Sequence, residues 1–216
     1  MLYEKGTIVK YPEIFLFDYI KMLLLVFLII LVAYLVPVYQ EPRIVNNVLN
    51  EDECEYIKDK AKNKLANSTT GVEHTFDDNV RKSETAWLSN TDPVIRKIVE
   101  RCIKHTDRPF ENCENLQVIR YKEGGYYRPH HDIIKGQKNI RMYTFLIALN
   151  DEYEGGETEF PNLNKKYKLR KGDLLLFDTV DNYEFDTSKA LHGGRPVKNG
   201  EKWVCNLWVR KYPYSN

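Results

Sequence analysis

The sequence is poor in the features that mark several common classes of protein. It has only 4 cysteines in 216 residues, and no two of them stand at the CxxC spacing of zinc and redox motifs. The charge is nearly balanced, with 32 Lys and Arg against 31 Asp and Glu, so nucleic acid is not indicated as a partner. Internal repeats and low-complexity tracts are also missing. These absences leave a globular domain and one long apolar segment to explain.

The cysteines are expected to be buried or half-buried thiols of the core. If the domain lies in an oxidising compartment, a bridge between Cys102 and Cys113 can form. The other two cysteines are Cys54 and Cys205.

The long apolar segment runs from Met22 to Val38 without a charge. It is slightly shorter than the roughly 20 residues of a membrane-spanning helix, although "IFLFDYI" before it adds apolar length around Asp18. A cleaved signal peptide and a buried helix are the alternatives, but "VAYLVP" lacks small residues at the spacing of a signal-peptide cleavage site. We therefore expect a transmembrane signal-anchor at 22–38 after a short cytosolic segment at 1–21.

The distribution of positive charge around this segment predicts its orientation. Lys5, Lys10 and Lys21 precede the apolar run and Arg43 follows it. Because Lys and Arg are retained on the cytosolic side, we expect a single-pass membrane protein whose C-terminal domain lies in the endoplasmic reticulum lumen.

Two helices are expected after the apolar segment. Asn50 and Glu53 form a capping box before "CEYIKDKAKNKL", and Thr91 is expected to cap a second helix with Pro93 in its first turn. The polar stretch 67–84 between them is expected to be a loop. The apolar stripes are Cys54, Ile57, Ala61 and Leu65 in the first helix, and Val94, Ile95, Ile98, Val99, Cys102 and Ile103 in the second.

From residue 116 the pattern changes to short apolar runs of β-forming residues. "LQVIRY", "YTFLIAL", "DLLLF" and "WVCNLWV" are separated by the turn signals "EGG", "NDEYEGGE", "RKGD" and "KNGE". Two helices followed by many strands predict an α+β fold, with a sandwich or jelly roll behind a helical layer.

The stretch "YYRPHHDIIKG" at 126–136 is the strongest chemical signal in the chain. It is consistent with a metal site, with a catalytic acid–base pair, or with a polar loop. In a strand, His130 and Asp132 would share one face and His131 would point the other way, as a rim residue. His192 is the natural third ligand, because it lies in the strand-rich half of the chain.

The two remaining histidines fit a shared site less well. His74 falls in the polar loop and His105 at the end of the second helix. Two histidines and one carboxylate are typical of the facial triad of non-haem Fe(II) oxygenases. Zinc sites more often use cysteine or three histidines.

Several motifs in fixed order resemble the prolyl 4-hydroxylase family of Fe(II)- and 2-oxoglutarate-dependent dioxygenases. They are "YKEGGYYRPHHD", "RMYTFLIALND", "EGGETEFP", "KGDLLLFD" and "LHGGRPVKNGEKWVCNLWVR", preceded by "PRIVNNVLNEDECEYI", "VRKS" and "ENLQVIRY". The resemblance covers Glu41 to Lys211 and implies a dioxygenase domain at 41–216. It also implies a double-stranded β-helix (jelly-roll) core with N-terminal supporting helices, which here would follow the transmembrane helix.

The resemblance implies roles for the residues that match the family's motifs. The iron ligands would be His130, Asp132 and His192. Lys202 would pair with the far carboxylate of 2-oxoglutarate, because a buried carboxylate needs a cation as its partner. Tyr121 and Thr144 would line the same co-substrate pocket.

The peptide substrate would meet a second set of residues. The candidates are Tyr127, Arg141, Trp208, Arg81 and Ser83. Cys205 would be a core position beside the site. Two residues depart from the family's pattern, namely Ala148, where many relatives carry an aromatic residue, and Arg210, where some carry a histidine; both bear on substrate choice.

The activity implied by the resemblance is hydroxylation of peptidyl proline, of the procollagen-proline 4-dioxygenase type. Fe(II) is the metal, 2-oxoglutarate and O2 are the co-substrates, succinate and CO2 are products, and ascorbate restores oxidised iron. The alternatives are a related oxygenase that acts on lysine or another substrate, and a membrane-tethered jelly-roll domain that binds without turnover. A zinc hydrolase is less well supported, because no general base is evident near the triad.

Overall fold

The computed structural model describes residues 13–70, 75–134 and 136–215 of the chain. They fall into two units, one before Tyr39 and one from Tyr39 onward. Each unit is described by itself below.

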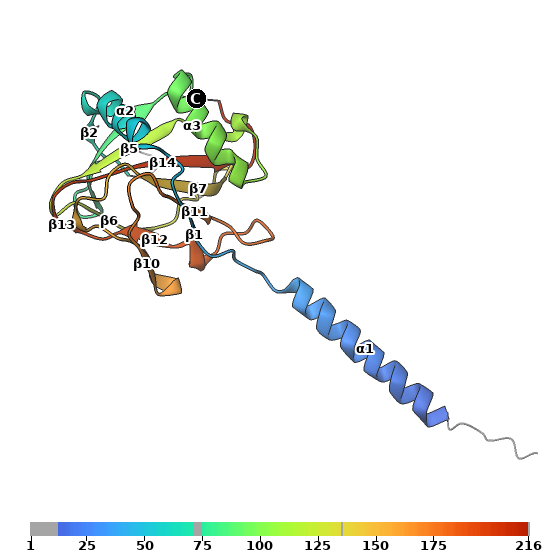
Figure 1. Ribbon diagram of the computed structural model, residues 1–216. Coiled ribbons are helices and arrows are strands. Elements are labelled where there is room, and N and C mark those ends of the chain that lie inside the picture. Colours follow the sequence, from blue (N-terminus) through green and yellow to red (C-terminus); the bar gives the residue numbers. More distant parts are fainter. Residues whose placement is uncertain (1–12, 71–74, 135, 216) are drawn as a thin grey trace, which may run out of the picture. The chain divides into compact units, whose positions relative to one another are not determined.

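In its described part, the first unit contains one helix, α1 (Glu13–Leu35) (Figure 1). Its stretch Phe17–Leu35 is long and apolar enough to cross a membrane, with a mean hydropathy of 2.3. The expected segment at 22–38 is therefore shifted toward the N-terminus. The helix ends two residues before Pro37, because a proline disfavours the helical conformation in the residue that precedes it. Most of the expected cytosolic segment, including Lys5 and Lys10, lies outside the described residues.

The second unit is built on antiparallel sheets, and among the described residues the larger sheet has seven strands. Its long central strands match the four apolar runs that the sequence indicates. In order across the sheet, the strands are β1 (Arg43–Val45), β11 (Leu174–Asp178), β7 (Arg141–Ala148), β14 (Lys202–Arg210), β5 (Leu116–Tyr121), β4 (Glu84–Leu88) and β2 (Ala66–Asn67).

A smaller sheet faces the first, and a two-stranded ribbon lies beside it (Figure 1). In order, the smaller sheet contains β10 (Lys165–Tyr167), β9 (Thr158–Phe160), β12 (His192–Gly194), β6 (Tyr126–His130) and β3 (Arg81–Lys82), and the ribbon contains β13 (Val197–Asn199) and β8 (Glu154–Gly155). Phe160 of the smaller sheet packs edge-on against Phe177 of the larger sheet, with 5.0 Å between ring centroids.

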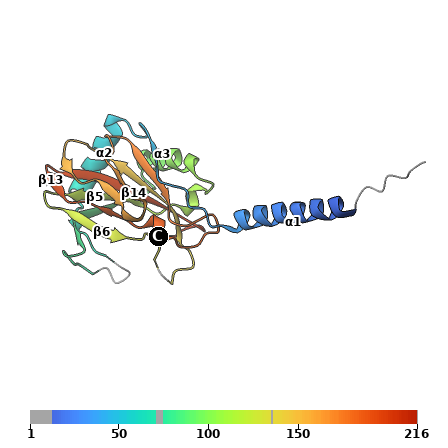
Figure 2. The ribbon, with the colours of Figure 1, turned by 90° about the horizontal axis from the view of Figure 1, so that it is seen from below.

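The outer face of the larger sheet is covered by α2 (Glu51–Lys62) and α3 (Pro93–Cys102) (Figure 2). The buried residues of both helices form one apolar cluster with alternate residues of the central strands, including Phe145 and Leu207. Strand β14 shows the alternation directly: Trp203 and Cys205 face the helices, whereas Lys202 and Val204 face the smaller sheet. The larger sheet therefore has one face for the core and one for a site.

Helix α2 confirms the expected capping box. The Asn50 side chain accepts from the Glu53 amide, and the Glu53 side chain accepts from the Asn50 amide. Cys54, Ile57 and Ala61 are buried as expected, but the helix ends at Lys62, so Leu65 is not part of its stripe.

The cap of α3 differs from the expectation. Asp92, not Thr91, is the N-cap residue, and its Oδ1 accepts hydrogen bonds from the amides of Val94 and Ile95. Pro93 occupies the first turn, as expected. An aspartate adjacent to the proline can reach two free amides at once, whereas Thr91 is occupied with Ser89.

The expectation of a loop at 67–84 is wrong in part, because β3 and the first residue of β4 lie within it. Hydroxyl groups replace apolar contacts there: the Ser68 Oγ lies 2.7 Å from that of Ser83 and 2.6 Å from Oγ1 of Thr85. Neighbouring strands supply the backbone partners, so polar residues can form strands that the sequence pattern does not indicate. In the part of the chain that the structure describes, four short 3-10 helices also occur, at Ile103–His105, Phe110–Asn112, Pro161–Leu163 and Ser188–Ala190.

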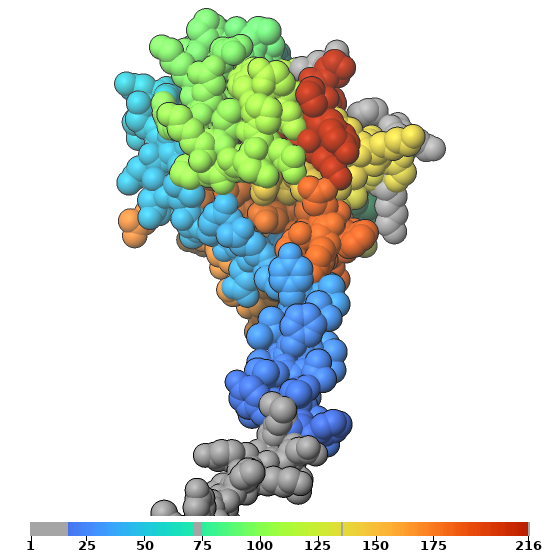
Figure 3. Space-filling model, turned by 90° about the vertical axis from the view of Figure 1, so that its right-hand side faces the viewer, coloured from blue at the N-terminus to red at the C-terminus, as the bar shows by residue number. Residues whose placement is uncertain are grey.

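The end of the chain lies on the surface of the second unit (Figure 3). After β14, Lys211 donates its amide hydrogen to the carbonyl of Ile140 and Tyr214 donates to that of Glu111. All four cysteines are buried and free, so Cys102 and Cys113 are not bridged.

Candidate active site

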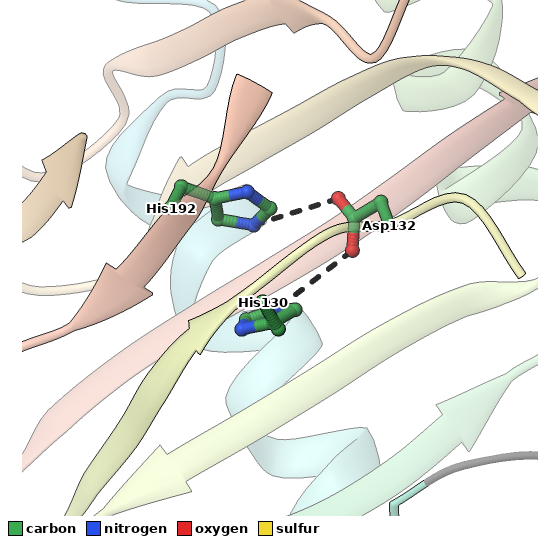
Figure 4. A group of neighbouring side chains, drawn as sticks. All are labelled: His130, Asp132 and His192. Carbon is green, nitrogen blue, oxygen red and sulfur yellow. Dashed lines mark ion pairs between the residues drawn. The ribbon is translucent and has the colours of Figure 1, made fainter. Parts of the chain in front are cut away.

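Three side chains from the smaller sheet and the loop after β6 converge on one point (Figure 4). His130, Asp132 and His192 each offer a ligand atom, and these atoms lie within 4.8 Å of one another. Nε2 of His130 is 3.8 Å from Oδ1 of Asp132, and Nε2 of His192 is 3.6 Å from its Oδ2. The three residues that the sequence singled out as a triad are thus brought together.

The pairing of β6 with β12 sets this geometry. His130 ends β6, His192 begins β12, and the two residues are direct partners across the antiparallel pair. Gly193 permits the close approach, because a Cβ there would lie 2.9 Å from the carbonyl oxygen of Tyr127. Asp132 lies beyond the end of β6, not within a strand as expected, yet it still faces the two histidines.

Hydrogen bonds to the backbone orient both imidazoles. Nδ1 of His130 lies 2.8 Å from the carbonyl of Arg128, and Nδ1 of His192 lies 3.0 Å from that of Ala190. A carbonyl oxygen only accepts, so each Nδ1 carries the proton and each Nε2 presents its lone pair toward Asp132. Proteins orient the histidine ligands of metals through hydrogen bonds of this kind.

The protonation states of His130 and Asp132 also suit the binding of a metal cation. Burial, followed by the neighbouring His192, lowers the pKa of His130 to about 3, so its imidazole is neutral. Burial alone would raise the pKa of Asp132, but the two histidines, Arg141 and a hydrogen bond outweigh burial and keep the carboxyl ionised. That hydrogen bond is donated by Thr144 Oγ1 to Asp132 Oδ2 over 2.6 Å.

Aromatic rings enclose the histidines. Tyr127 stacks on His130 at 3.6 Å between centroids, and Phe160 and Phe177 lie 5.6 and 4.6 Å from His192. Two imidazoles and one carboxylate beside aromatic rings fit a non-haem Fe(II) centre with open coordination positions.

Lys202 is a buried cation on the inner face of the larger sheet. It is 4% exposed, and no carboxylate of the described residues pairs with it. Its Nζ donates to the carbonyl of Gly156 over 2.7 Å and lies 5.5 Å from the ring of Tyr121, its cross-strand partner. Burial lowers the pKa of Lys202 to about 8. A buried ammonium without an acidic partner is a site for an anion.

Tyr121 lies beside this cation. It is buried, and burial raises the pKa of its hydroxyl although Arg81 nearby lowers it. It packs in a cluster with Ile119, Val204 and Tyr127. An anion bound at Lys202 would therefore meet the Tyr121 side chain as well.

A groove of about 600 Å³ opens beside the triad. This cavity, called the groove, has walls from Lys64 and residues 66–70, from Arg81, from β4, β5, β6, β7 and β14, and from the loop 131–134. Trp208 and Trp87 stand in its wall with 6.1 Å between ring centroids. Four of the five candidate substrate residues, Tyr127, Arg141, Trp208 and Arg81, line it.

Arg141 and Trp208 form a stacked pair in the groove wall. The guanidinium of Arg141 lies 3.6 Å from the Trp208 ring centroid. It is held by two hydrogen bonds, of 2.7 and 2.8 Å, to the Glu114 carboxylate. Arg210 uses the same carboxylate, with Nε 2.7 Å from Oε1 of Glu114. Glu114 was not singled out from the sequence, because no local pattern distinguishes it from acidic residues that lie on the surface.

Arg81 is a second buried cation without a carboxylate partner among the described residues. It is 5% exposed. Its Nε donates to Ser83 Oγ over 2.8 Å and its guanidinium lies 4.7 Å from the Tyr127 ring centroid. Ser83 contacts Arg81 but does not line the groove, so it lies behind the groove wall.

The other expected positions vary in how close they come to the site. Cys205 belongs to the core, as expected, but it faces α2 and α3 rather than the site. Ala148 is fully buried against Phe160 and Phe177. His131 lines the groove and lies 3.5 Å from Asp186. His105 ends a 3-10 helix outside the triad, and His74 lies outside the described residues.

Sequence comparisons identify relatives over most of the chain. The profile of the 2OG-Fe(II) oxygenase superfamily matches residues 116–210, which contain the triad and Lys202. A protein of Acanthamoeba polyphaga mimivirus that is classed with the prolyl 4-hydroxylases is 38% identical over an alignment of 190 residues, and the match covers 82% of this chain and 77% of the relative. Prolyl 4-hydroxylase 1 of Arabidopsis thaliana is 33% identical over an alignment of 196 residues, and the match covers 79% of this chain and 69% of the relative.

A solved structure shares the fold. The viral collagen prolyl hydroxylase vCPH from Paramecium Bursaria Chlorella virus-1, in its complex with 2OG, matches with a TM-score of 0.66 and 28% identity. The match covers 80% of this chain and 97% of that chain. It confirms a mixed α/β fold with antiparallel sheets that matches the jelly roll of the 2OG-Fe oxygenases.

Proposed function

Because the chain belongs to the prolyl 4-hydroxylase family of 2OG-Fe(II) oxygenases, we propose that it hydroxylates peptidyl proline with 2-oxoglutarate and O2 and releases succinate and CO2. The observation that carries this proposal is the presence of two features on the facing sides of the two sheets. One is a His–Asp–His triad fit for Fe(II), and the other is a buried, unpaired lysine fit for a dicarboxylate.

His130, Asp132 and His192 would hold the metal. When bound, Fe(II) supplies the activation of O2 that couples decarboxylation of 2-oxoglutarate to hydroxylation. The chain contributes orientation: the two Nδ1 hydrogen bonds fix the imidazoles, and Thr144 fixes the carboxylate of Asp132. Thr144 therefore acts on the metal ligand, which is a different contribution from the pocket-lining role expected from the sequence.

The co-substrate would extend from the metal toward Lys202. The ammonium of Lys202 would pair with the far carboxylate of 2-oxoglutarate, and Tyr121 would lie beside the same carboxylate. Because Lys202 is buried, water competes poorly with the carboxylate for its protons.

The peptide would occupy the groove. Its target proline would approach the metal past Tyr127, which stacks on His130, and the flanking residues would lie along the paired side chains of Arg141 and Trp208. Arg81 and Ser83 would support Tyr127 from behind. Since vCPH is named a collagen prolyl hydroxylase, collagen-like peptides are the first substrates to test.

The proposal is tested with full-length protein purified in detergent. Succinate and hydroxyproline are measured with Fe(II), 2-oxoglutarate and a panel of collagen-like, other proline-rich and lysine-containing peptides. Equal amounts of succinate and hydroxyproline are expected for at least one proline peptide. Hydroxylysine without hydroxyproline would favour the related oxygenase, and no succinate with any peptide would favour a domain that binds without turnover. Ascorbate, which we propose restores iron after uncoupled turnover, should prolong the linear phase of product formation.

We also infer that α1 anchors the protein in a membrane with the enzyme domain in the lumen of the endoplasmic reticulum. The apolar stretch Phe17–Leu35 supports this, together with Lys5 and Lys10 before it in the sequence and Arg43 after it. An acceptor site for N-glycosylation engineered just after Val38 should be modified in microsomes. The exposed Asn67, which begins the sequence "NST", must be removed first as a competing acceptor.

Free thiols are compatible with this compartment because all four are buried. Burial raises the pKa of Cys102 and of Cys113 to about 12, and that of Cys54 to about 11. A thiol that stays protonated and inaccessible reacts slowly with oxidants, so a lumenal domain can retain these thiols.

A further inference from the structure

The groove carries more positive charge than its enclosed acids can balance. Its described walls contain Lys64, Arg81 and Arg141, and the one carboxylate among them is that of Asp132. Asp132 faces His130 and His192 and is committed to the metal in the proposed function, on which this inference rests. The cations of the groove must therefore be balanced by other groups or by a ligand.

Arg141 shares its carboxylate partner, Glu114, with Arg210. Glu114 accepts from Arg141 through both oxygens and from Arg210 through one of them. Both guanidinium groups and the carboxylate are largely buried, with side-chain exposures of 14%, 8% and 4%. Arg210 otherwise contacts neutral groups, namely Gln137 Oε1 and the carbonyl of Asn139. Two cations with one anion leave one positive charge at this end of the groove.

Arg81 and Lys64 add to that charge. Arg81 is buried and bonds only to hydroxyl groups and aromatic rings among the described residues. Lys64 is exposed at the mouth of the groove and forms no ion pair within the described part of the chain. The described residues thus place the equivalent of three uncompensated positive charges around the cavity: Lys64, Arg81 and one of the Arg141–Arg210 pair.

Loading the active site would not cancel this excess. The charges of Fe(II) and of 2-oxoglutarate are equal and opposite, and the same holds for Asp132 and Lys202. The loaded metal and co-substrate site is then neutral, and the groove cations remain available to the peptide. Low-dielectric walls concentrate such a field inside a cleft and attract ligands of the opposite sign.

We propose that the groove selects acidic peptides, in which aspartate or glutamate residues flank the target proline. The acid at one side of the proline would lie toward Arg141 and that at the other toward Arg81 and Lys64. Charge complementarity of this kind sets the choice of partner and the rate of encounter more than the chemistry at the metal. The proposal therefore concerns binding, and it leaves the rate of the bound complex unchanged.

The test compares two peptides that differ only in charge. Each carries the same (Pro-Pro-Gly)5 core, and its ends carry either two glutamates or two lysines. Binding is measured by calorimetry, without O2, on the full-length chain in detergent loaded with Fe(II) and 2-oxoglutarate. The acidic peptide should bind about tenfold more tightly at low salt, the size expected for a few partly screened ion pairs. The difference should shrink as salt rises, and in turnover it should appear in KM, with kcat equal.

Two matched variants assign the effect to the groove. Lys64→Glu reverses a charge at the groove mouth and should reduce the preference for the acidic peptide at least threefold, by the same reasoning on exposed pairs. Lys97→Glu makes the same change in net charge on the exposed face of α3, outside the groove lining, and should leave the preference intact. Both variants should retain the parent's requirement for 2-oxoglutarate.

The outcomes separate this inference from the proposed function. Hydroxylation of both peptides with equal affinity, or an equal response to the two variants, would overturn the charge selection and leave the proline hydroxylase intact. Binding of the acidic peptide without any hydroxyproline on admission of O2 would support the groove and count against the proposed activity. Tighter binding of the lysine peptide would overturn the inference outright.

Discussion

The unpaired ammonium of Lys202 offers the sharpest test of the proposed chemistry. It is buried, and its one hydrogen-bond partner among the described residues is the carbonyl of Gly156. Replacement by methionine keeps the length of the side chain and removes the charge. If Lys202 anchors 2-oxoglutarate, the Lys202→Met variant leaves the far carboxylate without a partner in a buried pocket.

The size of the effect on binding follows from the cost of an unpaired buried charge. Removing one partner of such a pair costs about 2–5 kcal/mol. At tenfold per 1.4 kcal/mol, the requirement for 2-oxoglutarate should rise by at least about thirtyfold. Iron affinity should be unaffected, because Lys202 lies outside the group of metal ligands.

Stability should change in the opposite direction. Burial lowers the pKa of Lys202 from 10.5 to about 8, so below pH 8 the folded chain holds a charge that it solvates poorly. At 1.36 kcal/mol per unit, the charge opposes folding by about 3 kcal/mol at neutral pH. The unfolded chain binds the extra proton between pH 8 and 10.5, so the stability of the parent rises with pH across that window. The Lys202→Met variant should be more stable at pH 7 and lack this rise.

Three measurements on full-length protein test these expectations together. They are succinate formation against 2-oxoglutarate concentration, Fe(II) titration, and denaturant unfolding at several pH values. Lys198→Met is the matched control, since Lys198 is exposed on β13 and should change none of the three. An unchanged 2-oxoglutarate requirement in Lys202→Met would refute the anchor, and a less stable variant would refute the view that the cation is unpaired.

Three further changes test the triad and the core. Loss of a residue that only orients a metal ligand costs roughly 10- to 100-fold in metal affinity. His192→Ala removes a ligand itself, so it should lower the Fe(II) affinity measured by titration by more than that. Thr144→Val should lower Fe(II) affinity by about tenfold, since only the hydrogen bond to Asp132 disappears; an unchanged affinity would contradict its orienting role. Phe145→Ala should cost about 3–5 kcal/mol in denaturant unfolding, because Phe145 is fully buried under α2 and α3, and a loss below 1 kcal/mol, roughly, would contradict that packing.

The larger elements were predictable because their residues repeat at a fixed period. The apolar stripes at α2 and α3 indicated helices with one buried face, and the four apolar runs indicated strands. The structure has a helix or a strand at each of these places. The strands β3 and β6 were not predictable in this way, since Arg81–Lys82 and Tyr126–His130 carry polar residues toward the cavity. In these strands, polar residues of the candidate site stand where apolar residues would otherwise indicate a strand. Pairing with neighbouring strands supplies the backbone hydrogen bonds.

The triad could be chosen from the sequence because histidines are few, whereas its surroundings could not. Glu114 and Arg210 are 96 residues apart, and no local pattern links them. Only the pairing of β14 with β5 and β7 brings the end of the chain to the residues before β5. The sharing of one carboxylate by two arginines is a consequence of topology, and so is the net charge of the groove.

The choice between an enzyme and a domain that only binds can be argued from the same unpaired charges. Lys202 and Arg81 are buried without carboxylate partners among the described residues, and each opposes folding of the ligand-free chain. Apolar residues at both positions would give a more stable jelly roll, as replacement of buried ions by apolar side chains often does. A site that held only a metal would need neither cation, because His130, Asp132 and His192 supply the ligands and a further positive charge nearby would only repel the metal. Retaining Lys202 alongside the triad is explained when a dicarboxylate and a metal must be bound at the same time, which is the requirement of a 2-oxoglutarate-dependent reaction.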